Sequence, residues 1–510
     1  MDIKVPEGKW GDIQGDYILA ALEQHFLNGD AYVMIDEVFS IVKRAKKETP
    51  FDVFRADFAS LVREGLLRRE GRRVYLRDTL RYEDSAATQL ASILRYNKLH
   101  CPTLPDTITT KEGISLCDEQ RDALGLVLSH RLSIVLGGAG TGKSSLIQAI
   151  ATSASSGFGD LVLCAPTGKA ARNLAERTGL IARTVHSALG VIPDADFLAL
   201  VCWPNIRLVV VDEASMLTTG MLAGILERVT GSCRVVLLGD PNQLLSVGSG
   251  NVLPDLLRLG VPHICLMENH RQSKGASELL SNVTGFSSLR NGNDLVFGES
   301  FDLRSMSEKA AKTAIVDEAA TRYKAGESVQ VLSPFNNATE LSVSKLNKAI
   351  REQVNPDAPG KLSFGDRFRD GDKVIILNND RDRDCSNGDV GILRIFCTEK
   401  RNTCFYVELP DGRRPVWHTY EDLKNIALAY ALTVHKSQGS EYDTILLPIT
   451  DSFSTMLYRN LIYTAISRAR RKVILYGSKN ALSVAVQKLA RERRSELVAK
   501  CNMVAYKKAA

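Results

Sequence analysis

Residues 131–154 read RLSIVLGGAGTGKSSLIQAIATSA, and this stretch decides the fold of the chain. An apolar run precedes a glycine-rich loop, and a helix-like run follows it. The spacing Gly-x4-Gly-Lys-Ser, from Gly137 to Ser144, is typical of a loop that cradles phosphates between a strand and a helix. A helix that begins near Lys143 adds its positive dipole end. The stretch therefore predicts a nucleotide-binding α/β domain.

Each part of this loop has an expected contact with a nucleoside triphosphate. Lys143 should reach the β- and γ-phosphate oxygens, and the hydroxyl of Ser144 should ligate Mg²⁺. A glycine-rich loop also matches such a pattern by chance, but the strand before it and the helix after it argue against that alternative. The other loop residues expected at the cofactor are Gly138, Ala139, Gly140, Thr141, Gly142 and Ser145.

A second motif, LVVVDEAS at 208–215, supplies carboxylates. Four apolar residues bring Asp212 to the end of a buried strand. Asp212 is expected to hold Mg²⁺, and Glu213 to orient the attacking water. An acidic pair after a strand is also a common plain turn, but the phosphate loop upstream favours the catalytic interpretation.

Three further polar residues are candidates for contact with the γ-phosphate. Gln243 lies in LLGDPNQLLSVGSG (237–250), Arg271 in ENHRQS (268–273) and Arg468 in YTAISRAR (463–470). An arginine on the γ-phosphate is worth about 10³–10⁵ in rate. Taken singly, such residues are more often turn residues or surface ion pairs. If Arg468 belongs to a second α/β half, ATP would lie between two domains.

The order of elements along the 510 residues predicts an α/β fold with two parallel-sheet domains. Short apolar strands alternate with helical stretches in two blocks, and short alternating strands with Gly and Asn/Asp turns lie between them. Residues 17–86 have the helix, helix, helix, hairpin order of a winged helix. The expected parts are an N-terminal domain (1–100), a linker (101–113), the first α/β domain (114–280), the second (281–478) with a β-barrel insert (362–428), and a basic C-terminal tail (479–510).

Composition narrows the function classes. The net charge is +6, and residues 459–510 alone carry 13 Lys/Arg against two Asp/Glu, which fits a polyanion partner or a solvated helix face. No stretch approaches the roughly 20 apolar residues of a membrane span, and the N-terminus lacks the apolar core of a signal peptide. The ten cysteines show no paired spacing. We expect a cytoplasmic protein with reduced thiols.

The motifs, in their order, resemble those of superfamily 1 helicases, in particular the RecD-like branch that moves 5′ to 3′ on single-stranded DNA. The resemblance covers roughly residues 114–478 and, more weakly, 17–86. It implies two RecA-like P-loop domains, an SH3-like barrel insert and an N-terminal winged-helix-like domain. The stretches that carry it are SLCDEQRDAL, GGAGTGKSS, APTGKAARNLAERTG, RTVHSALG, VVVDEASM, GDPNQLLSVGSG, ENHRQS, YALTVHKSQGSEYD and LIYTAISRAR.

The resemblance also implies roles for single residues. Gln120 would read the adenine, and Glu441 would contact the ribose. Ala139 and Ser144 stand where the family often has Pro and Thr, and neither change removes a needed group. The residues implied on the γ-phosphate are Gln243, Arg271 and Arg468; those implied on DNA are Thr167, His186, Thr433 and His435.

The DNA side carries open alternatives. Aromatic residues make up only 6% of the chain, so base stacking must rest on few residues. Trp203 and Phe335 are candidates, each more often a core residue, and both histidines could equally be core residues. The interval 191–207, where the family has a strand-separating pin, is short.

Together these observations predict an ATP- and Mg²⁺-dependent DNA helicase or translocase, acting as a monomer in repair, recombination or replication. Its substrates would be single-stranded DNA and single-strand/duplex junctions, with protein partners in those pathways. The 5′-to-3′ polarity comes from the resemblance alone. Two alternatives stay open: an ATPase subunit of a larger recombination or nuclease complex, and a nucleic-acid-binding module that ATP switches without movement. An RNA-directed motor is a lesser variant.

Overall fold

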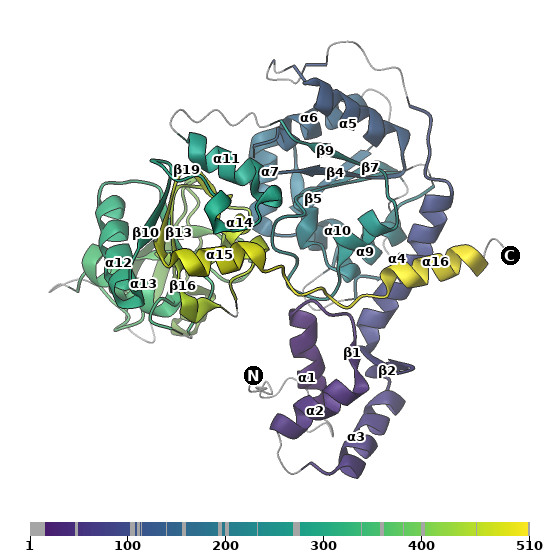
Figure 1. Cartoon of the computed structure of the whole chain (residues 1–510), viewed down its shortest axis with the longest axis horizontal. Helices are drawn as coiled ribbons and strands as arrows, with labels where there is room; N and C mark the ends of the chain where they lie inside the picture. Colours follow the sequence, from purple (N-terminus) through teal and green to yellow (C-terminus); the bar gives the residue numbers. More distant parts are fainter. Residues whose placement is uncertain are drawn as a thin grey trace.

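The computed structural model shows an N-terminal domain, two α/β domains and a small β domain (Figure 1). In Figure 1 the second α/β domain and the β domain lie to the left, the first α/β domain to the upper right, and the N-terminal domain below. The residues that the structure describes are 16–45, 49–101, 108–109, 113, 115–138, 140–155, 160–191, 196–198, 203, 205–231, 233–268, 276–337, 339–357, 362–380, 382–398, 403–454 and 456–507.

The N-terminal domain has three helices and a three-stranded antiparallel sheet in the order β1-β3-β2. Its core contains Leu22, Phe54 and Leu61, all buried. The three helices and the hairpin follow one another as predicted over 17–86, but a short strand that was not predicted, β1, lies between the first two helices and pairs with β3. The winged-helix assignment stays a prediction. The elements are α1 (Asp16–Leu27), β1 (Val33–Met34), α2 (Ile35–Ala45), α3 (Phe51–Arg63), β2 (Leu67–Glu70) and β3 (Arg73–Leu76).

A long helix, α4 (Arg77–Arg95), connects this domain to the first α/β domain. Its buried residues Ala86, Ala87 and Leu90 share a core with α9 of that domain. The last helix of the chain, α16 (Leu497–Lys507), packs on α4 (Figure 1). The tail predicted at 479–510 therefore contains two helices that pack against the body of the molecule, α16 and α15 of the second α/β domain. Residues 488–496, which join these helices, are called the strap below.

The carboxyl group of Glu83 on α4 is fully buried beneath the strap. Its Oε1 accepts hydrogen bonds from the Ser495 hydroxyl (3.1 Å) and the Glu496 amide (3.0 Å), and within the described residues its Oε2 has no partner. Burial raises the pKa of Glu83 to about 7 from the ordinary 4.5. The folded protein therefore keeps a proton on Glu83 that the unfolded chain releases as the pH rises above that ordinary value.

This linkage predicts a pH-dependent difference between the wild type and the variant Glu83→Gln. The stability contributed by protonated Glu83 is fully present below the unfolded pKa and is lost as the pH rises through the folded pKa. The free energy of unfolding of the wild type should therefore fall relative to the variant by on the order of 3 kcal/mol between pH 4 and pH 8. Urea denaturation of both proteins across this range measures the difference. A difference that does not change with pH would contradict the prediction.

The first α/β domain is built on a six-stranded parallel sheet in the order β6-β5-β7-β8-β4-β9. The central strands β4, β7 and β8 are apolar and mostly buried, as strands covered on both faces must be. The elements are α5 (Asp118–Ser129), β4 (Leu132–Gly137), α6 (Lys143–Ser155), β5 (Asp160–Ala165), α7 (Gly168–Thr178), β6 (Ala182–Thr184), α8 (Val185–Leu189), β7 (Ile206–Val211), η1 (Ala214–Met216), α9 (Thr219–Arg228), β8 (Arg234–Gly239), α10 (Val252–Arg258) and β9 (His263–Leu266).

The second α/β domain has a five-stranded parallel sheet in the order β10-β19-β18-β11-β17. The two parallel sheets predicted from the two blocks of apolar strands are thus confirmed. The elements are α11 (Ser277–Thr284), η2 (Phe286–Ser288), η3 (Gly292–Asp294), β10 (Phe301–Ser305), α12 (Glu308–Lys324), β11 (Val329–Ser333), α13 (Val343–Val354), β17 (Ala431–Thr433), η5 (His435–Ser437), β18 (Tyr442–Ile449), η6 (Asp451–Phe453), α14 (Arg459–Ile466), β19 (Ala469–Gly477) and α15 (Lys479–Gln487).

The β insert forms a five-stranded antiparallel sheet in the order β15-β14-β13-β12-β16 around its own core, where Phe405 stacks on Trp417. It docks on α7 of the first domain, since Arg172 contacts Asp389 at 2.5 Å and the Ser386 hydroxyl at 3.1 Å. The insert therefore bridges both α/β domains. Its elements are β12 (Lys373–Ile376), β13 (Val390–Cys397), β14 (Cys404–Glu408), β15 (Val416–Trp417), η4 (Tyr420–Asn425) and β16 (Ile426–Leu428).

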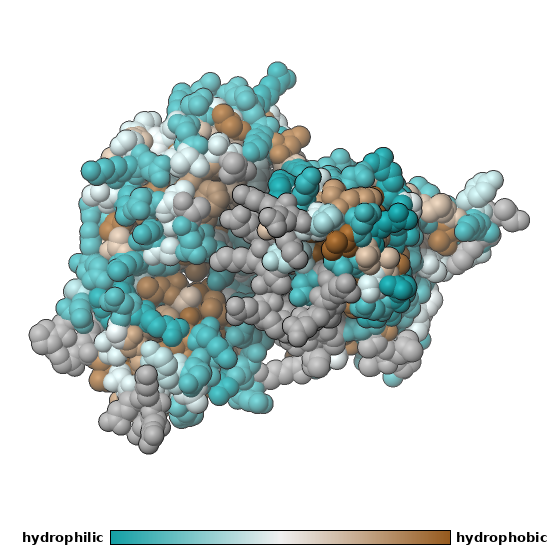
Figure 2. Space-filling model, turned by 90° about the horizontal axis from the view of Figure 1, so that it is seen from below, coloured by the Kyte–Doolittle hydropathy of each residue, from teal (hydrophilic) through white to brown (hydrophobic). Residues whose placement is uncertain are grey.

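The described helices include none that combines the length and the apolar character needed to cross a membrane. On the face seen in Figure 2, hydrophobic side chains form small patches separated by hydrophilic ones.

Candidate functional site

The phosphate loop lies at the carboxyl end of β4, where β4 gives way to α6. Gly140 and Gly142 have φ values of 86° and 74°, in the region that favours glycine. The ammonium of Lys143 lies over the loop and donates to the carbonyl oxygens of Gly137 (2.6 Å) and Gly138 (2.7 Å). A phosphate placed in the loop would meet this ammonium together with the first N–H groups of α6.

Gln120 is buried next to the same loop. Its amide nitrogen donates to the carbonyl oxygen of Gly142 (3.3 Å), and its amide oxygen accepts from the backbone of Cys117 (3.1 Å). The second contact forms a capping box at the start of α5. Gln120 thus has a structural role that the motif did not reveal, in a place that stays compatible with contact to an adenine.

The acidic pair follows β7, whose buried valines bring it to the same edge of the sheet. Asp212 is half-buried, but its Oδ1 is buried and has no hydrogen-bond partner within the described residues. Burial and the neighbouring Glu213 carboxylate raise the pKa of Asp212. Glu213 itself has a φ of 52°, a left-handed conformation that costs energy in a residue other than glycine.

These observations fit a divalent cation. A buried carboxylate oxygen without a partner is costly unless a ligand satisfies it, and Mg²⁺ prefers such oxygens together with hydroxyls and phosphates. Asp212 and Ser144 line the same pocket, so the pair can hold Mg²⁺ beside the phosphates. Glu213, with its strained backbone, lines the same pocket and adds a second carboxylate to it.

The opposite wall of the pocket comes from two domains. Gln243 follows β8 of the first domain and is buried, with its Oε1 unpartnered among the described residues. Arg468 follows α14 of the second domain, and its guanidinium donates to the Thr464 carbonyl and the Ser467 hydroxyl, both at 3.2 Å. In the described part of the chain Arg468 forms no ion pair, so a buried cation faces the pocket without a carboxylate.

Sequence reasoning missed a pair behind the phosphate loop. The hydroxyl of Tyr463, on α14, donates to Asp240 Oδ2 at 2.6 Å, and burial raises the pKa of Asp240. A Cβ added to Gly138 would lie 3.1 Å from that hydroxyl. The pair joins the two domains directly beneath the loop. Asp240 lies in the motif GDPNQ, but no local pattern points to its tyrosine partner.

Glu441 lies at the rim of the pocket, between two arginines. Arg177 of α7 contacts its Oε1 at 2.9 Å, and Arg470 of β19 contacts its Oε2 at 3.1 Å. The three charges link the first domain to the second. Arg177 and Arg470 were not among the predicted residues, because exposed arginines on a helix and a strand carry no distinguishing pattern.

The structure therefore brings most predicted nucleotide-site residues together. Two of them, Ala139 and Arg271, lie outside the described residues. Ser145 lies on α6, one residue beyond the pocket lining. The lining consists of Gly138, Gly140, Thr141, Gly142, Lys143, Ser144, Arg177, Asp212, Glu213, Gln243, Glu441, Ser467, Arg468 and Arg470.

The residues predicted on DNA are less clearly gathered. The Thr167 hydroxyl caps α7 by accepting from the Ala170 amide (3.2 Å), and Thr433 accepts from the Lys436 amide (3.2 Å). His186 packs against Phe197, and burial lowers its pKa. Each of these three thus has a structural contact of its own.

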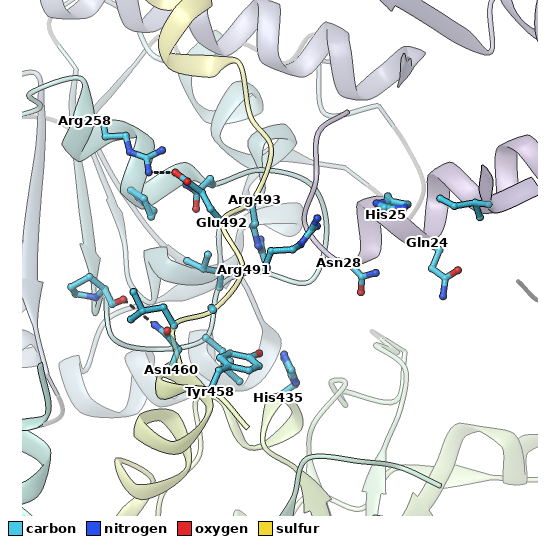
Figure 3. Close-up of a pocket in the computed structure, with 18 of the residues that line it drawn as sticks. Gln24, His25, Asn28, Arg258, His435, Tyr458, Asn460, Arg491, Glu492 and Arg493 are labelled. Carbon is cyan, nitrogen blue, oxygen red and sulfur yellow. Dashed lines mark hydrogen bonds and ion pairs between the residues drawn. The ribbon is translucent and has the colours of Figure 1, made fainter. Parts of the chain in front are cut away.

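His435 lies in a groove between the N-terminal domain, both α/β domains and the strap (Figure 3). Burial and the nearby Arg493 lower its pKa. Of the two stacking candidates, Trp203 lies in the core of the first domain, and Phe335 packs edge-on against Phe453 in the second. Trp203 is a core residue, whereas Phe335 is half-buried at the edge of the core of the second domain.

Three family profiles match consecutive parts of the chain. They are an AAA domain (115–293), the SH3 domain of ATP-dependent RecD-like DNA helicases (346–408) and a UvrD-like helicase C-terminal domain (428–476). The RecBCD enzyme subunit RecD of Mycolicibacterium smegmatis is 30% identical over 422 residues, which cover 73% of each chain. The chain belongs to the RecD-like family of superfamily 1 helicases. The resemblance and the SH3-like insert predicted from the sequence are thereby confirmed.

A second RecD-like relative covers more of this chain. The ATP-dependent RecD2 DNA helicase of Deinococcus radiodurans is 32% identical over 476 residues, 92% of this chain but 63% of that protein. This chain thus spans less than two thirds of that relative's length. Among solved structures, Pif1 helicase from Bacteroides with ADP-AlF3 and ssDNA aligns over 78% of this chain and 97% of its own, with 17% identity and a TM-score of 0.47.

The pin predicted for this RecD-like chain at 191–207 lies mostly outside the described residues. Of that interval the structure describes 191, 196–198, 203 and 205–207. Phe197 contacts Tyr82 of α4, and its carbonyl accepts from the Arg228 guanidinium at 2.8 Å. This part of the interval is anchored on the first domain.

Proposed function

We propose that this chain is an ATP-dependent DNA translocase and helicase that moves 5′ to 3′ on single-stranded DNA. The observation that carries the proposal is the pocket between the two α/β domains. One wall holds the phosphate loop and the acidic pair of the first domain, and the other holds Arg468 of the second. A nucleotide bound there touches both domains, so its hydrolysis changes their relative position.

Each residue of the pocket has its own role in the hydrolysis of ATP. Lys143 exchanges its contacts with the loop carbonyls for the β- and γ-phosphate oxygens. Glu213 orients the attacking water and accepts its proton, and Arg468 stabilises charge on the γ-phosphoryl oxygens. Ser144 and Asp212 would hold Mg²⁺, which when bound would supply neutralisation of the phosphate charge. Gln243 senses whether the γ-phosphate is present.

Movement on DNA follows from the same geometry. Binding of ATP closes the domains onto Arg468, and loss of the γ-phosphate releases them. If each domain grips the strand in turn, each cycle advances the protein along it. Opening one base-pair step costs about 1.4 kcal/mol on average, so geometry rather than energy limits unwinding. The groove that contains His435 opens beside Leu244 and Leu245, directly after Gln243, and offers a path for the strand near the sensor.

A second function is favoured by several relatives that are RecD subunits of the RecBCD enzyme. Under that reading this chain is the ATPase subunit of a larger recombination complex and unwinds little alone. It would still hydrolyse ATP in the presence of single-stranded DNA. The two functions differ in whether the isolated chain opens a duplex.

The proposal predicts ATP-dependent opening of a duplex with a 5′ single-stranded tail and no opening of the matched duplex with a 3′ tail. Strand release from labelled duplexes measures both, with Lys143→Ala as the control that should show none. Equal opening of both substrates would refute the polarity. DNA-stimulated hydrolysis without opening would refute autonomous unwinding and favour the subunit function.

A further inference from the structure

The strap runs from the second α/β domain across the N-terminal domain and is fixed to it by main-chain and side-chain contacts. The Ala31 amide donates to the Arg494 carbonyl (2.7 Å), and the Arg494 amide donates to Asp30 (3.0 Å). The Arg494 guanidinium forms an ion pair with Glu37 on α2. Figure 3 shows Arg491, Glu492 and Arg493 between Arg258 of α10 and Asn28, which directly follows α1.

Arg493 leaves the strap and inserts into the loop 240–251, which follows β8. Its Nη1 donates to the Ser246 hydroxyl (2.9 Å), the Gly250 carbonyl (2.9 Å) and the Gly248 carbonyl (3.4 Å), and its Nη2 donates to the Ser246 carbonyl. Every one of these acceptors is uncharged. Three carbonyls of one loop thus converge on one guanidinium, whose planar fork suits such an arrangement.

Arg493 is half-buried, and the number of loop acceptors around its guanidinium indicates a dedicated contact. Burial lowers the pKa of Arg493 to about 10, so it stays charged near neutral pH. Within the described residues no carboxylate forms an ion pair with it. Removing a cation from water is expensive unless its donors are satisfied, and here the loop carbonyls satisfy them.

Gly29 of the N-terminal domain closes the other side of Arg493. Its φ is +98°, and a Cβ added there would lie 2.2 Å from the arginine Nε. The Gly29 carbonyl accepts from the Gly250 amide at 2.9 Å, so the N-terminal domain also touches the loop directly. A side chain at this position would meet the Arg493 side chain where it now lies, so glycine leaves the room that the guanidinium occupies.

The same loop carries Gln243, whose other supports come from the second domain. The Asn460 amide donates to the Gln243 carbonyl (3.3 Å), and Gln438 donates to the Leu244 carbonyl (3.0 Å). The Leu244 amide donates to the Thr464 hydroxyl (2.8 Å). The second domain therefore holds the first half of the loop. Arg493 and Gly29 hold the second half, together with the Thr219 amide of α9, which donates to the Ser249 carbonyl (3.0 Å).

We propose that Arg493 is a positioning residue that holds Gln243 in place through the loop 240–251, and that the N-terminal domain controls ATP turnover through this contact. The proposal rests on the function proposed above. Arg493 does not touch the nucleotide; it fixes the loop that does. A ligand or partner that moves α1 and Gly29 would release the loop and slow hydrolysis.

The test compares Arg493→Ala and Arg493→Lys with the control Arg491→Ala. Arg491 lies on the same strap and pairs with Asp30 but does not contact the loop. With the full chain and oligo(dT), Arg493→Ala should lower kcat for ATP by on the order of 10²-fold with little change in KM, since small misplacements of catalytic groups cost that much. The kcat of Arg493→Lys should lie between those of Arg493→Ala and the wild type. The kcat of Arg491→Ala should stay within about threefold of the wild-type value.

A second measurement keeps the proposal separate from the proposed function. Hydrogen exchange of the amides at 244–250 needs no hydrolysis, and Arg493→Ala and Gly29→Ala should both accelerate it while Arg491→Ala does not. If the wild type does not hydrolyse ATP but the variants accelerate hydrogen exchange as expected, the proposed function is refuted. The structural role of the Arg493 contact is then still supported. Unchanged exchange in Arg493→Ala, or a kcat within threefold of an active, folded wild type, would overturn the inference.

Discussion

ATP turnover should fall by about 10³-fold or more when Arg468 is replaced by alanine, while nucleotide binding persists. Arg468 is the buried cation that the second domain contributes to the pocket, and its guanidinium has no carboxylate partner among the described residues. Its charge is therefore free to stabilise the γ-phosphoryl oxygens in the transition state. The phosphate loop lies on the other domain, so binding of ADP should change little. Steady-state hydrolysis with oligo(dT), together with titration of a fluorescent ADP, measures both quantities.

The matched control is Arg471→Ala. Arg471 lies three residues further along on β19 and is exposed. It should keep turnover near the wild-type value, because it does not line the pocket. Arg468→Lys keeps the charge but loses the fork and should recover only part of the activity. Turnover of a folded Arg468→Ala within threefold of wild type would remove Arg468 from the catalytic set and with it the argument that nucleotide closes the two domains.

Motifs that act through local geometry were the ones that the sequence predicted well. The phosphate loop at 137–144 needs only a strand, glycines and a helix, all contiguous. The same holds for Asp212 and Glu213 after the apolar strand β7. In both motifs the residues proposed for the chemistry directly follow a buried strand, and parallel strands place their carboxyl ends at one edge of the sheet.

Contacts between distant segments were not predictable in this way. The Tyr463–Asp240 pair and the insertion of Arg493 into the loop after β8 depend on how the domains pack, and neither contact has a local sequence pattern.

The contacts of the basic C-terminal segment were likewise not predictable from the sequence. Its charge suggested a polyanion partner or a solvated face, but Arg491 and Arg494 pair with Asp30 and Glu37 of the N-terminal domain. Charge counts do not distinguish an internal ion pair from a binding surface.

The chemical step itself should depend on Glu213. Replacement by glutamine keeps the size of the side chain and its tolerance of the left-handed backbone at φ 52°, but removes the base. We expect kcat to fall by about 10²–10⁴-fold, the range for loss of a positioned general base. ATP should bind as well or better, because the repulsion between the Glu213 and Asp212 carboxylates disappears.

Glu176→Gln is the matched control for this substitution, since Glu176 is exposed on α7 and lies one residue before Arg177 at the pocket rim. Single-turnover hydrolysis measures the chemical step separately from product release. Rapid phosphate formation should be lost in Glu213→Gln but persist in Glu176→Gln. A melting temperature near the wild-type value excludes misfolding as the cause. If single-turnover rates were equal in the two variants, water activation would have to come from another residue, and the strained backbone at 213 would serve only to aim Asp212.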